Sequence, residues 1–195
     1  MEIKNIILSD YIRVFEDCIP EEILNSFINI CEEHKGFHTA AIGENTVNEN
    51  IRKADAWQLN NLGEKSMTTI HWTNFFTSLF QEKLMEYNRI FSSTKFETVR
   101  PHVSELSVLR YKETFHYLFH TDQSKWINRQ WSCIYLLNDN YEGGDLIFST
   151  PDGVGEKKIK KKKNTMIIWP SNFMYPHTIT PVSKGVRFSV VAWAK

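Results

Sequence analysis

The chain has 195 residues, 42% hydrophobic and 24% charged, which is enough for one hydrophobic core and too few for two ordinary domains. Its 23 basic and 23 acidic residues cancel, which excludes a molecule-wide field that would attract nucleic acid or an anionic membrane. Three cysteines without close spacing exclude a disulfide framework and a zinc knuckle. We therefore predict a single domain, residues 1–195, in a reducing compartment.

The amino-terminal segment carries an early acid, Glu2, and only a short apolar run before Ser9, which is not the pattern of a secretory signal. No stretch approaches the roughly 18 apolar residues that a membrane helix needs. We expect a soluble, cytoplasmic protein with no membrane partner.

Two helices are predicted in the first hundred residues. The first begins at Pro20, carries acids near its positive end and an apolar stripe, and ends near Gly36. The second runs from about Met67 to Phe91, where large apolar residues recur at helical spacing. Between them, the stretch from Ala40 to Asn61 shows no clear period and is predicted to be a long loop with one short strand at most. The helical layer thus covers about residues 1–100.

After Pro101 the pattern changes to short apolar or alternating runs separated by turn residues, which is typical of an antiparallel sandwich or small barrel. The β core thus covers about residues 101–195, and the predicted fold class is α+β, mainly β, with the amino-terminal helices packed on one sheet. The predicted strands are Glu105 to Tyr111, Trp131 to Leu137, Asp145 to Ser149, Lys158 to Lys163, Thr165 to Trp169 and Arg187 to Ala194.

Three side chains form a candidate metal site. If the segment His120-Thr121-Asp122 is extended, residues two apart face the same side, so an imidazole and a carboxylate can reach a common point. His177, between two apolar strands, can supply a third ligand. Two histidines and one carboxylate leave positions open on a metal, the arrangement that non-haem Fe(II) uses, whereas zinc usually takes a fourth ligand or a water. By itself the pair of His120 and Asp122 also fits an ordinary surface or capping pair.

The last predicted strand adds a cation. Its alternate residues form two mostly apolar faces, with Arg187, Ser189, Val191 and Trp193 on one and Phe188, Val190, Ala192 and Ala194 on the other. This strand is therefore predicted to be buried on both sides, and a buried guanidinium needs an anion, for which a carboxylate is the best match. Arg187 is a candidate clamp for a dicarboxylic co-substrate, with Ser189 adding a hydroxyl. Taken alone, Arg187 is more often a surface arginine paired with a glutamate.

Several short motifs occur together in the second half of the chain. They are Leu109-Arg110-Tyr111, Tyr117 through Asp122, Leu137-Asn138-Asp139 with Glu142-Gly143-Gly144-Asp145, Ile168 through Ser171, and His177 through Arg187. With these motifs the chain resembles the prolyl 4-hydroxylase-like family of Fe(II)/2-oxoglutarate dioxygenases. The ten-residue interval from His177 to Arg187 matches the family's interval between the distal histidine and the co-substrate cation. Val14 through Asp17 and Ile51 through Asp55 resemble the family's earlier segments, so the similarity spans nearly the whole chain.

The resemblance implies a double-stranded β-helix, or jelly roll, with Fe(II) held by His120, Asp122 and His177 and with 2-oxoglutarate bound through Arg187. The implied reaction uses O2, hydroxylates a C–H bond and releases succinate and CO2, with ascorbate as a further candidate cofactor. By position, the other candidate residues are Tyr111, Ser189 and Trp193 near the co-substrate and Tyr117 and Arg129 near the substrate.

Two positions depart from the family pattern. Leu136 stands where the family often has a tyrosine that helps hold the co-substrate, and the neighbouring Tyr135 should point the other way. A hydroxyl would then have to come from Ser189 or Tyr111, or co-substrate affinity would be weaker. Asn164 stands where relatives often have glycine, and asparagine is a tolerable turn residue.

Three functions stay open. Hydroxylation of a peptide or protein residue, with proline favoured, is what the resemblance implies. Hydroxylation of a small metabolite or a nucleic-acid component is the alternative, with the run Lys157–Lys163 and the loop 40–61 as its surface, although that run also fits a solvated hairpin that protects a sheet edge. The third is a jelly-roll binding module without chemistry, which has no reason to keep the three ligands and Arg187. The tryptophans Trp57, Trp126 and Trp131 fit either a substrate groove or ordinary packing.

Overall fold

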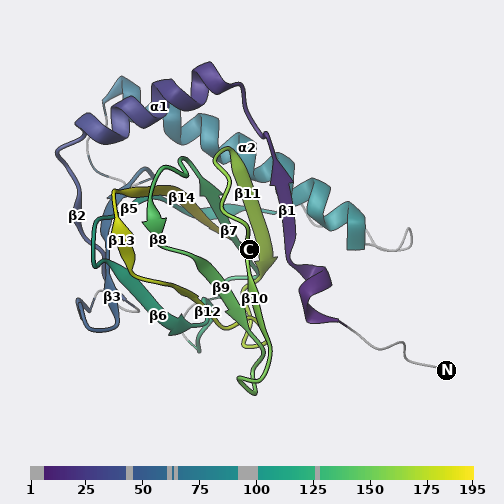
Figure 1. The fold of residues 1–195 in the computed structure, drawn as a ribbon. Helices are drawn as coiled ribbons and strands as arrows, with labels where there is room; N and C mark the ends of the chain where they lie inside the picture. The colour runs from purple at the N-terminus through teal and green to yellow at the C-terminus, as the bar shows by residue number, and fades with distance from the viewer. Residues whose placement is uncertain (1–6, 43–45, 61–62, 64–65, 92–100, 126–127) are drawn as a thin grey trace.

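A computed structural model of the protein describes residues 7–42, 46–60, 63, 66–91, 101–125 and 128–195. Two antiparallel sheets dominate it, and the helices α1 (Glu21–Glu33) and α2 (Met67–Phe91) lie together on one side of the β structure (Figure 1). The predicted mainly-β fold with helices packed on one sheet is therefore confirmed. A short 3-10 helix, η1 (Leu8–Tyr11), precedes the first strand. No helix among the described residues is long and apolar enough to cross a membrane.

The larger sheet has seven strands. Their order is β1 (Arg13–Glu16), β11 (Thr165–Pro170), β7 (Trp131–Leu136), β14 (Arg187–Ala194), β5 (Val103–Tyr111), β4 (Asp55–Gln58) and β2 (His38–Thr39). The smaller sheet has the order β10 (Glu156–Lys158), β9 (Leu146–Ser149), β12 (His177–Ile179), β6 (His116–His120) and β3 (Arg52–Lys53). A separate pair joins β13 (Val182–Lys184) to β8 (Glu142–Gly143).

Strand alternation divides the larger sheet into an outer face and an inner face. The outer face packs against both helices, and on β14 it carries Phe188, Val190, Ala192 and Ala194. The inner face packs toward the smaller sheet, and on β14 it carries Val191 and the partly buried Trp193. As predicted, β14 is buried on both sides.

The first hundred residues contain more β structure than predicted. The helices are close to the expected ranges, and the hydroxyl of Ser66 accepts a hydrogen bond from the amide of Thr69 at 3.1 Å, which caps the start of α2. The stretch 40–61, however, contains two strands: β3 pairs with β6 in the smaller sheet, and β4 pairs with β5 in the larger sheet. Their pairing partners are distant in sequence, and Ala56 and Trp57 of β4 are both buried, so neither strand shows a clean alternation.

The predicted strand from Lys158 to Lys163 is wrong in its position. The observed strand β10 is Glu156–Lys158, and the ladder ends after the amide of Ile159 donates to the carbonyl of Leu146 at 2.9 Å. Beyond that point Lys161 turns inward and donates to two backbone carbonyls of the turn before β9. Residues 160–163, which were predicted to continue the strand, therefore lie outside the sheet.

Candidate metal centre and its pockets

The three predicted ligands converge at the junction of β6 and β12. These strands pair with His177 opposite His120, and Asp122 follows β6 directly. The Nε2 atoms of His120 and His177 lie 3.7 and 3.4 Å from the carboxylate oxygens of Asp122. One donor atom from each residue lies within 4.8 Å of the other two. Ligands that share a metal at about 2.1 Å and at right angles lie about 3 Å apart, so this donor set fits one ion after a small contraction.

Both imidazoles are oriented by the same local device. The Nδ1 atom of His120 lies 2.8 Å from the carbonyl of Leu118, and Nδ1 of His177 lies 3.0 Å from the carbonyl of Tyr175. A carbonyl accepts only, so Nδ1 carries the proton and Nε2 is free to bind a metal. Burial, assisted by the nearby His177, lowers the pKa of His120 to about 3. A neutral imidazole is the form that coordinates metal.

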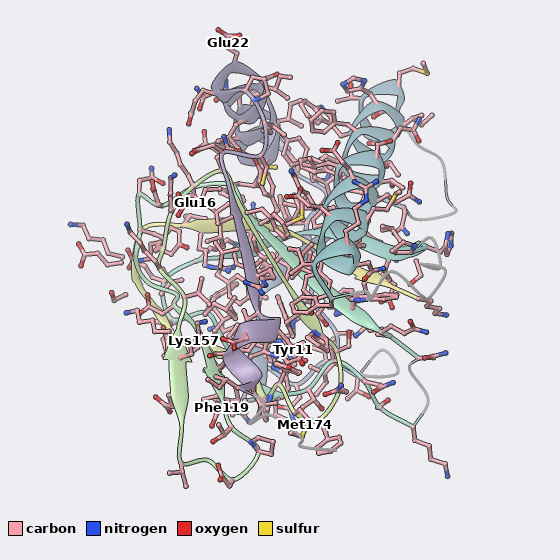
Figure 2. All side chains as sticks on the ribbon, turned by 90° about the vertical axis from the view of Figure 1, so that its right-hand side faces the viewer. Tyr11, Glu16, Glu22, Phe119, Lys157 and Met174 are labelled. Atoms are coloured by element: carbon pink, nitrogen blue, oxygen red, sulfur yellow. The ribbon has the colours of Figure 1, made fainter. Side chains whose placement is uncertain are left out.

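A β-bulge gives the site its aromatic cover. From His120 to Tyr117 the strand β6 uses three steps where β12 uses two, from His177 to Ile179. The extra residue brings Tyr117 to the same side as His120, and their rings stack with centroids 3.5 Å apart. Phe119 is 50% exposed and lies at the end of the molecule opposite Glu22 of α1 (Figure 2). Phe119, on the strand that carries His120, therefore lies far from the first helix.

Asp122 is held by a hydroxyl pair that the sequence reasoning missed. The hydroxyl of Ser132 donates to Oδ2 of Asp122 at 2.6 Å, and Ser132 in turn lies 2.7 Å from the hydroxyl of Ser171. Burial raises the pKa of the Asp122 carboxyl, whereas His177, His120 and the Ser132 hydrogen bond lower it, and the net pKa lies below the usual value. The sequence signal that could have revealed this contact is Ser132 itself, a serine within the otherwise apolar strand β7.

Arg187 is fully buried and only partly paired. Its Nη1 donates to the hydroxyl of Ser189 at 2.9 Å, and its guanidinium lies 5.2 Å from the ring centre of Tyr111. Its Nε and Nη2 have no hydrogen-bond partner among the described residues. Burying such donors unpaired costs several kcal/mol, so the site has the chemistry of a receptor for an anion.

Two small cavities lie beside the metal centre and beside Arg187, and they have Leu146 in common. The first is lined by the three candidate ligands and by Tyr111, Trp193 and Leu146. The second is lined by Arg187, Leu136 and again Leu146. Tyr111 lines the first cavity and lies 5.2 Å below the Arg187 guanidinium, so Leu146 and Tyr111 both lie between the metal centre and Arg187. As expected, Leu136 faces this inner space, whereas Tyr135 belongs to the outer core.

A third cavity, of about 180 Å³, also has Asp122 in its wall and is lined by Arg129, Arg52, Glu105, Tyr117 and Trp193, among others. Arg129 makes a two-pronged salt bridge with Glu105 and lies 3.8 Å above the ring of Trp193. Arg52 donates to the carbonyl of Ala41 at 2.8 Å and lies over the ring of Tyr117. The structure thus places Arg129 and Tyr117 beside the metal centre and adds Glu105 and Arg52 to the set.

Most of the remaining described sequence features lie away from the three candidate ligands. Most lysines of the run 157–163 contact acids or carbonyls of the same chain, as Lys158 does with Asp145, Lys162 with Glu16 and Lys163 with Glu21. Trp57 is buried in the outer core and stacks on His34 at 3.8 Å. Trp131 packs partly against the same core, and Trp126 lies outside the described residues.

Comparisons with known proteins agree with this geometry. Residues 106–195 match the sequence profile of the 2OG-Fe(II) oxygenase superfamily. The chain is 31% identical over 93 residues to the PKHD-type hydroxylase YbiX of Shigella boydii, which covers 43% of this chain and 40% of that relative. It is 33% identical over 100 residues to a PKHD-type hydroxylase of Xylella fastidiosa, covering 44% and 42%. The chain therefore spans less than half the length of these curated relatives.

Two solved structures show the same fold. A prolyl hydroxylase from Trichoplax adhaerens, in complex with a peptide fragment of the hypoxia inducible factor oxygen degradation domain, superposes with a TM-score of 0.75 at 15% identity, covering 95% of this chain and 84% of that one. A viral collagen prolyl hydroxylase from Paramecium Bursaria Chlorella virus-1, in complex with 2OG, superposes with a TM-score of 0.60 at 16% identity, covering 94% and 95%.

Proposed function

Because the resemblance to the prolyl 4-hydroxylase-like 2OG-Fe(II) oxygenases is confirmed in sequence and in fold, we propose that this chain is a dioxygenase that couples oxidation of 2-oxoglutarate to hydroxylation of a C–H bond. The observation that carries the proposal is the pairing of two features. One is a His-Asp-His set with both Nε2 atoms close to the same carboxylate, and the other is a fully buried guanidinium with two nitrogens that find no partner in the described ranges. The two facing sheets support a double-stranded β-helix, with residues 1–195 as one domain.

Each residue has a defined task in this mechanism. His120, Asp122 and His177 hold Fe(II), and Ser132 fixes the carboxylate so that it keeps one orientation. The chemistry that the iron would supply when bound is the use of O2 as oxidant, with one oxygen atom going to succinate as 2-oxoglutarate loses CO2 and the other to the hydroxylated C–H bond. Arg187 and Ser189 hold the distal carboxylate of the co-substrate above Tyr111. Tyr117 and Trp193 cover the inner cavity and exclude water from it.

The substrate approaches through the cavity that contains Arg129. Because Glu105 balances Arg129, the pair offers both a donor and an acceptor to a polar backbone. A peptidyl residue, with proline first, fits this polar cavity of about 180 Å³, and a structural neighbour was solved with a peptide. A small metabolite fits the cavity's size equally, and it is the second candidate. A nucleic-acid component is less favoured, because most lysines of the run 157–163 are already engaged within the chain.

The first test is spectroscopic. Anaerobic addition of Fe(II) and 2-oxoglutarate should give a weak visible charge-transfer band in the wild type and none in His177→Ala. His116→Ala is the matched control, because His116 lies on the same strand but contacts the carbonyl of Thr114 instead of the metal centre. Absence of the band in the wild type, or its persistence in His177→Ala, would reject the assigned ligand set.

The second test identifies the substrate class. Succinate release is measured with pools of proline-containing peptides, metabolites and oligonucleotides. We expect peptides to raise succinate release above the level without substrate. Stimulation by a metabolite pool alone would replace the peptide assignment with the second candidate.

A further inference from the structure

The far end of the co-substrate pocket lacks the tyrosine that the family often places at position 136. Leu136 is 3% exposed and offers no hydroxyl. Tyr135 cannot replace it, because its ring lies in the outer core and its hydroxyl donates to Oδ1 of Asn164 at 2.7 Å. Ser189 already accepts from Arg187, and Tyr111 lies with its ring beneath the guanidinium. The Ser189 hydroxyl can still donate its own proton to a distal carboxylate, but a phenol donor in addition to it must come from another element.

Tyr141, in the turn between β7 and β8, reaches this space. It is 6% exposed and lines the cavity that also contains Leu136 and Arg187. Gly144 shows how close the two side chains lie, since a Cβ at Gly144 would be 3.0 Å from Cδ of Arg187 and 3.1 Å from Cε2 of Tyr141. The Tyr141 ring and the aliphatic part of the Arg187 side chain therefore both pack against Gly144.

The charge environment keeps this phenol a hydrogen-bond donor. Burial raises the pKa of Tyr141, and the neighbouring Arg187 lowers it without cancelling the rise. The hydroxyl is therefore protonated at neutral pH, and it lies beside a cation whose Nε and Nη2 have no partner among the described residues. A carboxylate at this position can accept from both groups.

One lysine of the run 157–163 holds Tyr141 in place. Nζ of Lys161 donates to the carbonyls of Tyr141 and Gly143, both at 2.9 Å, and lies 4.2 Å above the ring of Tyr141. The ammonium thus ties both ends of the short turn and covers the phenol's face. Holding a partly buried ammonium between two carbonyls costs some desolvation, which is offset by the hydrogen bonds and the ring contact that it makes.

We propose that Tyr141 binds the distal carboxylate of the 2-oxo diacid together with Arg187, in place of a tyrosine at position 136, and that Lys161 is the positioning residue for it. The inference rests on the proposed function and names a part of the co-substrate site that no motif assigned. It also explains why Lys161 turns inward while its neighbours pair at the surface.

Binding is measured by calorimetry with Mn(II) in place of Fe(II), so that no turnover occurs. Tyr141→Phe removes only the hydroxyl, and we expect the Kd for 2-oxoglutarate to rise about tenfold, the size expected for one hydrogen bond to a charged group. The Kd for 2-oxopentanoate, which lacks the distal carboxylate, should not change. Tyr135→Phe is the matched control, because that phenol lies on the other face of β7 and should leave both affinities unchanged.

A swap provides the second variant. Leu136→Tyr combined with Tyr141→Phe should restore 2-oxoglutarate affinity to within about threefold of the wild type, which a merely structural role for Tyr141 would not allow. Lys161→Met should raise the KM for 2-oxoglutarate by severalfold and leave kcat unchanged. Both results support the assignment.

Three results would overturn it. An unchanged Kd in Tyr141→Phe, with a large rise in Arg187→Lys, rejects the role of Tyr141 while the proposed function stands. Equal weakening of both oxo acids in Tyr141→Phe indicates general damage to the pocket and rejects it as well. Failure of the wild type to bind 2-oxoglutarate with Mn(II) rejects the proposed function and the inference together.

Discussion

Arg110 and Arg187 lie on neighbouring strands of the larger sheet and on opposite faces of it. Arg110 faces outward, donates to Asp55 through two nitrogens at 2.8 and 3.0 Å, and lies over the ring of Phe37. Arg187 faces inward, and within the part of the chain that the structure describes it has one hydroxyl partner and two unpaired nitrogens. The same side chain is thus satisfied on one face and left partly unsatisfied on the other, only one residue pair away along the ladder.

The difference separates what stabilises this fold from what makes it a receptor. The outer face is closed by aromatic packing between α1, α2 and the sheet, and it needs nothing further. The inner face contains buried polar groups, Arg187, Ser189, Asp122 and Ser132, and among them Arg187 keeps two nitrogens without a partner among the described residues. Hydrogen bonds that the buried groups of the inner face do not form on folding can instead be formed with a ligand.

The largest expected effect is a loss of stability from the outer face. Phe27 is fully buried and contacts Trp72 and Phe76 with ring centroids 4.6 Å away in each case. We expect Phe27→Ala to lower the free energy of unfolding by about 3–5 kcal/mol in chemical denaturation. Ile70→Ala on the exposed side of α2 should change it by less than about 1 kcal/mol. Comparable losses from both variants would contradict the division into two faces.

A change of opposite sign is expected on the inner face. Arg187→Met replaces a buried, partly unpaired cation by an apolar chain, and without ligands it should raise the free energy of unfolding by about 1–3 kcal/mol. The same variant should lose binding of 2-oxoglutarate. A destabilisation of more than about 1 kcal/mol would show that Arg187 is satisfied within the chain, and the contrast with Arg110 would fail.

The hydroxyl pair behind Asp122 should affect metal affinity more than stability. Ser132→Ala removes the donor to Oδ2, and we expect the affinity for Fe(II) to fall roughly 10–100-fold, the usual effect of losing a group that orients a ligand. Ser171→Ala removes only the next hydroxyl and should cause a smaller loss. The measurement is metal titration followed by tryptophan fluorescence. Equal losses of Fe(II) affinity in the two variants would contradict the prediction that Ser132, which contacts Asp122 directly, matters more than Ser171.

Sequence reasoning located the chemistry because metal ligands are defined by residue type and spacing. Alternation along strands predicts that His120 and Asp122 share a side and that β14 has an inward face, whereas His177 was predicted from its place between two apolar strands and from the family resemblance. The bulge that turns Tyr117 toward His120 could not be predicted, because it is one extra residue in a pairing that joins distant segments. Ser132 and Ser171 were missed for the same reason, since their contact crosses 39 residues of chain.

Asn164 shows how a local departure can have a tertiary cause. Its backbone has φ of 58°, which explains why glycine also suits this position. Its buried side chain accepts from the amide of Ile19 and donates to the carbonyl of the same residue. The sequence indicates a turn here, but only the structure shows that the asparagine ties the start of α1 to the sheet.

The smallest expected effect is on stability, from removing the charge of Asp55, the partner of Arg110. Burial would raise the pKa of Asp55, but hydrogen bonds from Lys112 and Arg110 lower it below the usual value. A lowered pKa stabilises the fold above the unfolded carboxyl's pKa of about 3.9, and this stability is lost as pH falls through the lowered value. Asp55→Asn should therefore cost less than about 1 kcal/mol at pH 7 and almost nothing in strong acid. Denaturation curves across pH 2–7 measure this, and a cost that persists in acid would mean that the carboxylate's charge does not stabilise Arg110.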